Sequence, residues 1–300
     1  MQLEEQLRAT DADIAIVSYE RLCLASPRLA LPRVFKELLA RAGFEMEVLV
    51  TVRQPEGLLN SQYGWRMQHL REGRPFGLFA HAWLGSRVLD LVGLFGPWCK
   101  AARAFHAVPL HDASSRHPLV QRILEQTGLL PRLAFLAATN RIPTENRSPG
   151  PVAVEVARRL RRGGAHRVLG PAARAATAFV EEQAAARGLD EAAFHGLDPS
   201  MLAMVQATWC RADDRFAQMA WGQSWSARVA GEARRPMNEI ARLPHDTAIE
   251  HHLEDILQAA CERFQISRPF ASRGRRHDLP VLAKVERWAR AWSRLALSWV

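Results

Sequence analysis

The sequence has no apolar run that approaches the roughly 20 residues of a membrane-spanning helix. Its first residues, MQLEEQLRATDAD, are polar and acidic, whereas a signal peptide begins with a basic and then an apolar segment. Both absences favour a cytoplasmic protein without a membrane span. At 300 residues, 48% of them hydrophobic, the chain is long enough to bury one large core or two smaller ones.

Cysteine is scarce, and its spacing excludes two common uses. The four cysteines form no C-x-x-C pair and lie far apart, at Cys23, Cys99, Cys210 and Cys261. This pattern indicates neither a zinc site nor a disulfide framework. The histidines add little, because His251 and His252 are adjacent and point to different faces of a helix. We therefore expect reduced thiols and no metal site.

Lysine is almost absent: 37 of the 40 basic residues are arginine, and the net charge is +9. Such a charge suits an anionic partner, but a biased genomic base composition also produces an arginine excess. The basic residues concentrate only in RRLRRGGAHR (158–167) and SRGRRHD (272–278). Solvated helix ends and tails explain these runs equally well. A basic module that binds nucleic acid is therefore an alternative that the sequence does not favour.

Apolar runs and helical patterns alternate in the first part of the chain. DIAIVSYE (13–20) and EVLVTVR (47–53) are β-branched runs that predict buried strands. LPRVFKELLARAG (31–43) and the segment 56–73 have helical spacing, and each ends on a glycine. Strand, helix, strand and helix with short connections are typical of a parallel sheet in an α/β fold.

Further along, the patterns predict a helix over 81–96, a third strand over 104–110 and an amphipathic helix over 117–129. Turn-forming residues crowd together over 139–151, and the chain from there to about residue 265 has mostly helical patterns. We therefore expect three parts. They are an α/β core over 1–140, a helical continuation of the same domain over 141–265, and a basic tail with a terminal helix over 266–300.

Arg53 ends the predicted strand 47–53, and Ser61 follows eight residues later in the next helix. Ligands of parallel α/β sheets bind beyond the carboxyl ends of the strands, and arginine forms forked contacts with phosphate oxygens. The two residues therefore predict an anion clamp. The alternative is structural, with Arg53 bonded to loop carbonyls and Ser61 facing a neighbouring helix.

The stretch VRQPEGLLNSQY resembles the 3′-phosphate-binding segment of sulfotransferases that use 3′-phosphoadenosine-5′-phosphosulfate (PAPS). In that family a strand-end arginine and a serine eight residues later hold the 3′-phosphate. The resemblance to bacterial carbohydrate sulfotransferases extends to five further segments and covers about residues 5–228. Those segments are DIAIVSYERL, which looks like the strand that precedes this motif, and then FGPWCKAARAFHAVPLHD, HPLVQRILEQTGL, NRSPGPVAVEVARRL and ADDRFAQMAWGQSWS.

The resemblance implies a parallel sheet of the P-loop nucleotide-binding type and transfer of a sulfuryl group from PAPS to a hydroxyl of a carbohydrate. Arg53 and Ser61 would hold the 3′-phosphate of this co-substrate. Glu20 occupies the position at which related enzymes carry the base that accepts the proton of the acceptor hydroxyl. A local ion pair between Glu20 and Arg21 is the structural alternative.

Two departures from the family pattern bear on activity. No glycine-rich phosphate loop precedes Glu20, so the chain begins in what resembles the middle of the family domain. SRGRRHD has a single glycine and only superficially resembles the segment that closes over the nucleotide in cytosolic members. We therefore expect the chain as it stands not to turn over PAPS. A non-catalytic protein that binds a nucleotide, a glycan or a partner protein is the rival interpretation.

Overall fold

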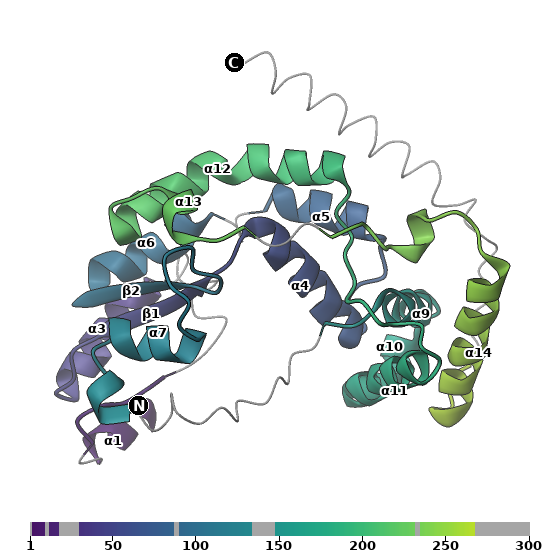
Figure 1. Cartoon of the computed structure of the whole chain (residues 1–300). Helices are drawn as coiled ribbons and strands as arrows, with labels where there is room; N and C mark the ends of the chain where they lie inside the picture. Colours follow the sequence, from purple (N-terminus) through teal and green to yellow (C-terminus); the bar gives the residue numbers. More distant parts are fainter. Residues whose placement is uncertain are drawn as a thin grey trace. The chain divides into compact units, whose positions relative to one another are not determined.

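The computed structural model describes residues 2–9, 12–17, 30–86, 90–133, 148–231 and 235–267. Two compact units share the chain, and each is assembled from three separate stretches (Figure 1). Unit 1 takes its described residues from Met1–Gln54, Gly85–Ile142 and Trp209–Glu232. Unit 2 takes its described residues from Pro55–Leu84, Pro143–Thr208 and Ala233–Val300. The three-part division expected from the sequence stays a prediction.

Unit 1 contains a parallel pair of strands, β1 (Glu47–Val52) and β2 (Ala104–Pro109), in register from Glu47 opposite Ala104 to Val52 opposite Pro109. The predicted strands 47–53 and 104–110 are thus confirmed. The helices of this unit are α1 (Gln2–Arg8), α3 (Leu31–Arg41), α6 (Leu91–Ala101), α7 (Leu119–Gln126), the second part of α12 (Pro199–Trp221) and α13 (Trp225–Arg228).

Burial alternates along β1, which corrects the expectation of a strand covered on both faces. Glu47, Leu49 and Thr51 are exposed, and the exposed fraction of Leu49 is 41%. Val52 on the other face is buried. Within the described residues, β1 pairs with a single strand and packs its valine face on the core. An apolar sequence therefore forms a half-covered strand here.

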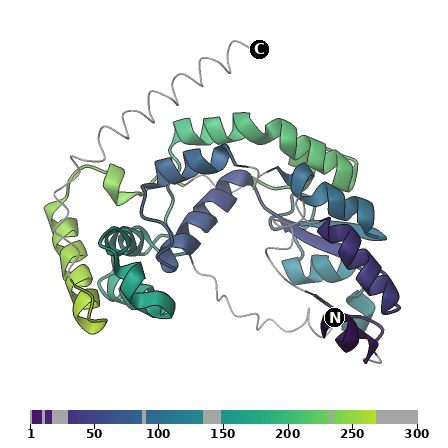
Figure 2. The ribbon, with the colours of Figure 1, turned by 180° about the vertical axis from the view of Figure 1, so that it is seen from behind.

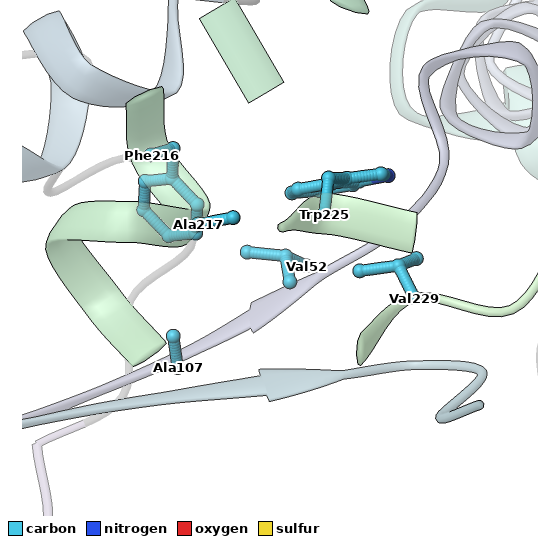
Figure 3. Close-up of a cluster of buried hydrophobic side chains, with 6 residues drawn as sticks. All are labelled: Val52, Ala107, Phe216, Ala217, Trp225 and Val229. Atoms are coloured by element: carbon cyan, nitrogen blue, oxygen red, sulfur yellow. The ribbon is translucent and has the colours of Figure 1, made fainter. Parts of the chain in front are cut away.

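The covered face of the sheet packs against residues that come much later in the chain. Val52 and Ala107 contact a buried cluster from α12, α13 and the segment after them (Figure 3). The later members of this cluster are Phe216, Ala217, Trp225 and Val229. A second cluster contains Leu7, Leu39, Met46 and Trp98 and joins α1 and α3 to α6.

The predicted strand over 13–20 is wrong for the described residues 13–17. They form no strand, and Ile16 is 77% exposed. Asp13 forms an ion pair with Arg132 at 2.9 Å. β-branched residues favour extended backbone, but pairing with a neighbour is what makes a strand, and residues 13–17 have no such pairing. Residues 18–20 lie outside the described part of the chain.

The expected helix over 81–96 is in fact two helices. α5 (Phe76–Leu84) belongs to unit 2, and α6 begins in unit 1 after Asp90. The Asp90 carboxylate accepts a hydrogen bond from the main-chain N–H of Gly93 at 2.9 Å, which caps the new helix. The apolar residues continue through both segments, so the sequence pattern alone does not show that a new helix begins after Asp90.

The expected helix over 56–73 is confirmed as α4 (Pro55–Gln68), but its end was placed too late. Leu70 adopts a left-handed conformation with φ of 48°, and the N–H of Arg71 donates to the carbonyl of Arg66 at 2.8 Å. A leucine therefore takes the terminal position that is usually occupied by glycine. No sequence rule favours a leucine there.

Unit 2 is helical throughout its regular elements, which confirms the helical patterns after residue 151. Besides α4 and α5 it contains α9 (Pro151–Arg162), α10 (Ala165–Leu169), η2 (Gly170–Ala172), α11 (Ala173–Ala186), the first part of α12, η3 (Ile240–Arg242) and α14 (Thr247–Arg263). α9, α11 and α14 pack side by side (Figure 1, Figure 2). Tyr63, Phe76 and Phe79 are fully buried beside them.

The described residues thus form a mixed α/β structure that is mostly helical and has a small parallel sheet. In this part of the chain, no helix combines the length and the apolar character that a membrane crossing requires.

Candidate functional site

Because β1 and β2 are parallel, their carboxyl ends meet at one edge of the sheet in unit 1. Arg53 directly follows β1 there and is half-buried. On the neighbouring strand, the N–H of Leu110 donates to the carbonyl of Val52 at 2.7 Å, so the pairing continues to the last residue of β1. The arginine therefore lies at the position where α/β sheets bind their ligands.

Gln54 fixes the backbone beside Arg53 through both ends of its amide. Its Oε1 accepts a hydrogen bond from Nε1 of Trp225 at 3.1 Å, and its Nε2 donates to the carbonyl of Val229 at 3.4 Å. Trp225 and Val229 also pack against Val52 (Figure 3). The segment from Trp225 to Val229 thus holds the carboxyl end of β1 in a defined position.

The loop after β2 is built around Asp112. Its Oδ1 accepts from the N–H and the hydroxyl of Ser114 at 2.8 and 2.7 Å. Its Oδ2 lies 3.6 Å from Arg122 and 3.5 Å from Arg228. Burial alone would raise the pKa of this carboxyl. The hydrogen bonds from Ser114 and the two guanidinium groups have the opposite effect and together outweigh burial, so the pKa is lower than usual. Asp112 is therefore an ion-paired carboxylate that organises the loop.

The two arginines around Asp112 also bond to protein groups. The buried Arg122 donates to the carbonyls of Pro109, Leu110 and His117, the latter two at 2.9 and 3.0 Å. Arg228 donates to the hydroxyl of Ser114 at 2.9 Å. Both guanidinium groups therefore stabilise the loop. Sequence reasoning missed them because neither stands in a recognisable motif.

Arg228 also stacks on an aromatic ring of the same unit. Its guanidinium carbon lies 5.8 Å from the centre of the Trp221 ring. Trp221 in turn donates from Nε1 to the carbonyl of Ala107 in β2 at 2.8 Å. Tryptophan hydrogen bonds therefore stabilise this edge of the sheet in addition to the ion pairs of Asp112.

Ser61 lies about two turns into α4, in unit 2, and is half-buried. Its neighbour Asn60 ties this turn to a distant segment. The amide oxygen of Asn60 accepts from the N–H of Gly196 at 2.9 Å, and its Nδ2 lies 3.3 Å from Nδ1 of His195. Arg53 belongs to unit 1 and Ser61 to unit 2, and their joint action on one phosphate stays a prediction.

Three other expectations concern Glu20, the basic run 272–278 and metal ligands. Glu20 and residues 272–278 lie outside the described part of the chain, so the role of Glu20 stays a prediction. In the ranges that the structure describes, no three side chains of histidine, cysteine, aspartate or glutamate gather as metal ligands. His106 instead lies 3.2 Å from the carboxylate of Glu47 across the two strands.

Unit 2 contains a buried carboxyl that sequence reasoning missed. Glu239 is 3% exposed, and its Oε1 accepts from the N–H of Phe76 at 2.7 Å. Its Oε2 has no hydrogen-bond partner among the described residues. Burial raises the pKa of Glu239 to about 7. The segment RPMNEIARLP around it has no periodic pattern, so nothing local in the sequence indicates burial.

A second buried carboxyl, Glu155, is fully paired. Arg158 donates to both of its oxygens at 2.8 Å, and Arg159 donates to one of them at 2.9 Å. Burial alone would raise the pKa of Glu155, but Arg158 and Arg159 outweigh this effect, so the pKa is lower than usual. The spacing of three and four residues along α9 is a signal that would have predicted this network.

The arrangement in unit 1 offers an arginine at the carboxyl end of a parallel strand, next to a loop that is held rigidly by its own ion pairs. An arginine so placed can bind an anion through forked N–H donors. Because the loop is already ordered, binding a ligand there would cost less conformational entropy.

No family model, curated protein or solved structure matches this chain.

Proposed function

We propose that the chain is a sulfotransferase-like protein that binds PAPS, with Arg53 and Ser61 holding the 3′-phosphate. The observation that carries this proposal is the position of Arg53, directly after β1 and two residues before α4. Its support is chemical. Arginine provides two parallel N–H donors for a phosphate, and a serine hydroxyl adds a neutral donor.

The reaction would transfer a sulfuryl group to a carbohydrate hydroxyl. The hydroxyl oxygen attacks the sulfur, the bond from sulfur to the bridging phosphate oxygen breaks, and adenosine 3′,5′-bisphosphate leaves with the electron pair. The proton of the hydroxyl passes to a base, a role that the resemblance gives to Glu20. Catalysis then depends on alignment and on stabilising the negative charge that grows on the leaving phosphate.

The 3′-phosphate distinguishes this proposal from general nucleotide binding. Calorimetry with the full chain should show binding of adenosine 3′,5′-bisphosphate and at least about tenfold weaker binding of adenosine 5′-monophosphate, which lacks the 3′-phosphate. Equal affinity for the two nucleotides would contradict the proposed clamp.

Transfer is measured separately, with sulfur-labelled PAPS and a panel of glycans. Because no glycine-rich phosphate loop precedes Glu20, we expect binding without transfer. Label on a glycan would overturn this expectation and would also exclude the rival function, a non-catalytic protein that retains the nucleotide site.

A further inference from the structure

A group of arginines gathers in unit 2 around the end of α9, the short helix α10 and the loop after α4. We call it the arginine face and define it by Arg71, Arg161, Arg162 and Arg167. Arg71, Arg162 and Arg167 are exposed, and Arg161 is half-exposed. None of them belongs to the strand edge that carries Arg53.

Packing brings together the segments that carry these residues, although the segments are far apart in the sequence. The loop after α4 packs on α9 so closely that a Cβ at Gly73 would lie 3.1 Å from Cγ of Arg161 and 3.5 Å from Cγ of Arg162. Gly164 then turns the chain with φ of 86° and starts α10, which carries Arg167. The loop after α4 and the helix α10 therefore both lie next to the end of α9.

The charge of this surface acts on a neighbouring histidine. Burial lowers the pKa of His166, and the positive charges of Arg161 and Arg167 lower it further. Cations from α9 and α10 thus converge on one imidazole. This agrees with the close packing of the two helices.

Other arginines of unit 2 are neutralised by carboxylates, namely Arg159 by Glu155, Glu250 and Glu254, Arg74 by Glu72, and Arg174 by Glu181. Among the described residues, Arg71, Arg161 and Arg167 have no carboxylate within ion-pair distance. A helix C-terminus favours nearby cations, which accounts for Arg161 and Arg167 at the ends of α9 and α10. Arg71 follows the end of α4 in the same way, and its N–H caps the carbonyl of Arg66.

Arg71 takes part in a stack of planar groups at the edge of the face. Its guanidinium carbon lies 4.9 Å from the centre of the Trp65 ring. Trp65 stacks on His69 with 4.3 Å between ring centres and 32° between ring planes. Nucleic-acid bases stack on guanidinium planes and on aromatic rings, whereas the sugars of an acidic polysaccharide have no aromatic face.

We propose that the arginine face binds single-stranded nucleic acid, with phosphates on Arg161 and Arg167 and a base stacked on the guanidinium of Arg71, which lies over the Trp65 ring. This function is separate from the proposed nucleotide site and uses other residues. Guanidinium groups suit phosphate oxygens because their paired donors match two oxygens at once. The charges of Arg71, Arg161 and Arg167, beside the planar groups stacked at Trp65, combine the two features by which proteins bind single strands.

The first test measures binding of fluorescein-labelled oligothymidylate to the full chain by fluorescence anisotropy. Two phosphate contacts predict a fall in affinity of about sevenfold between about 50 mM and about 200 mM salt. The double variant R161Q/R167Q should weaken binding at least tenfold at low salt and flatten this salt dependence. Affinity and salt dependence equal to those of the unchanged chain would overturn the proposal.

Arg187→Gln is the control for the loss of one positive charge elsewhere in unit 2. Arg187 is exposed and follows α11, whose 14 residues separate it by about 20 Å from the end of the helix near α10. It should change the affinity less than twofold. A loss as large as that of R161Q/R167Q would show that only net charge matters and would overturn the assignment to this face.

Arg71→Lys distinguishes nucleic acid from other polyanions. Lysine keeps the charge but has no planar group, so binding of oligothymidylate should weaken about fivefold while binding of heparin stays unchanged. Equal effects on both ligands would overturn nucleic acid as the partner and favour an acidic polysaccharide. Because Arg71 is exposed, the variant should fold, and circular dichroism checks that it does.

Discussion

Glu239 accepts a hydrogen bond from the main-chain N–H of Phe76, the first residue of α5, with 2.7 Å between Oε1 and N. The residues are 163 positions apart in the sequence. The bond supplies an acceptor to an N–H that no turn of the helix can satisfy. It also leaves a carboxyl group in a buried environment, where it holds its proton up to a pH of about 7.

We expect the stability of unit 2 to fall as the pH rises from about 4.5 to about 7. The ordinary pKa of 4.5 applies to Glu239 in the unfolded chain, and burial raises it to about 7 in the folded chain. Between these values the folded chain keeps a proton that the unfolded chain has lost, so stability decreases with pH. The total effect is on the order of 3 kcal/mol.

Urea unfolding across this pH range measures the effect. The other charged groups that act on Glu239 are Arg242, Arg158 and Glu155. The substitution of Glu239 does not alter these three residues. Glu239→Gln should remove most of the pH dependence, and Glu262→Gln, at an exposed position of the same unit, should leave it intact. A slope that survives Glu239→Gln would assign the pH dependence to another group.

Arg53→Ala should weaken the binding of adenosine 3′,5′-bisphosphate by roughly 1.5–3 kcal/mol, the magnitude of a hydrogen bond to a charged group. Ser61→Ala should cost about 1 kcal/mol because the hydroxyl is neutral. Calorimetry measures both. Arg103→Ala is the matched control, since Arg103 is exposed and lies at the amino end of β2. An unchanged affinity in a folded Arg53→Ala variant rules out the clamp.

Gly196→Ala should destabilise unit 2 by about 1–3 kcal/mol, because an added methyl group overpacks the core. A Cβ at this position would lie 2.2 Å from Cγ of Phe76, which is fully buried. Gly77→Ala is the control, because the nearest atom to its Cβ would be the sulfur of Met201 at 4.0 Å. Thermal unfolding compares the two variants, and equal melting temperatures would show that Phe76 moves aside freely.

Arg122→Ala should destabilise unit 1 by about 3–5 kcal/mol, since it removes the buried donor to three carbonyls and one of the two cations that face Asp112. Arg116→Ala in the same loop is exposed and should cost less than about 0.5 kcal/mol. Chemical denaturation measures both. A cost for Arg122→Ala no larger than that for Arg116→Ala would mean that the loop does not depend on this cation.

Local patterns predicted the elements whose shape is decided locally. β1, α7 and α9 follow from the spacing of apolar residues, and Arg53 stands at its strand end as a consequence. The apolar run 13–17 failed because strand formation depends on a partner. The ordering of the site depends on long-range bonds such as Trp225 to Gln54, which spans 171 positions. A single sequence does not encode such pairs in any local pattern.

The interleaving of the two units sets an order of events during synthesis on the ribosome. Both strands of the sheet are complete once Pro109 has been added, yet Phe216, Trp225 and Val229, which cover Val52 and Ala107, come about a hundred residues later. At common translation rates this interval lasts about 5–20 s. During that time the nascent chain carries a sheet whose apolar face lacks its native cover, and this is when it would most need a chaperone.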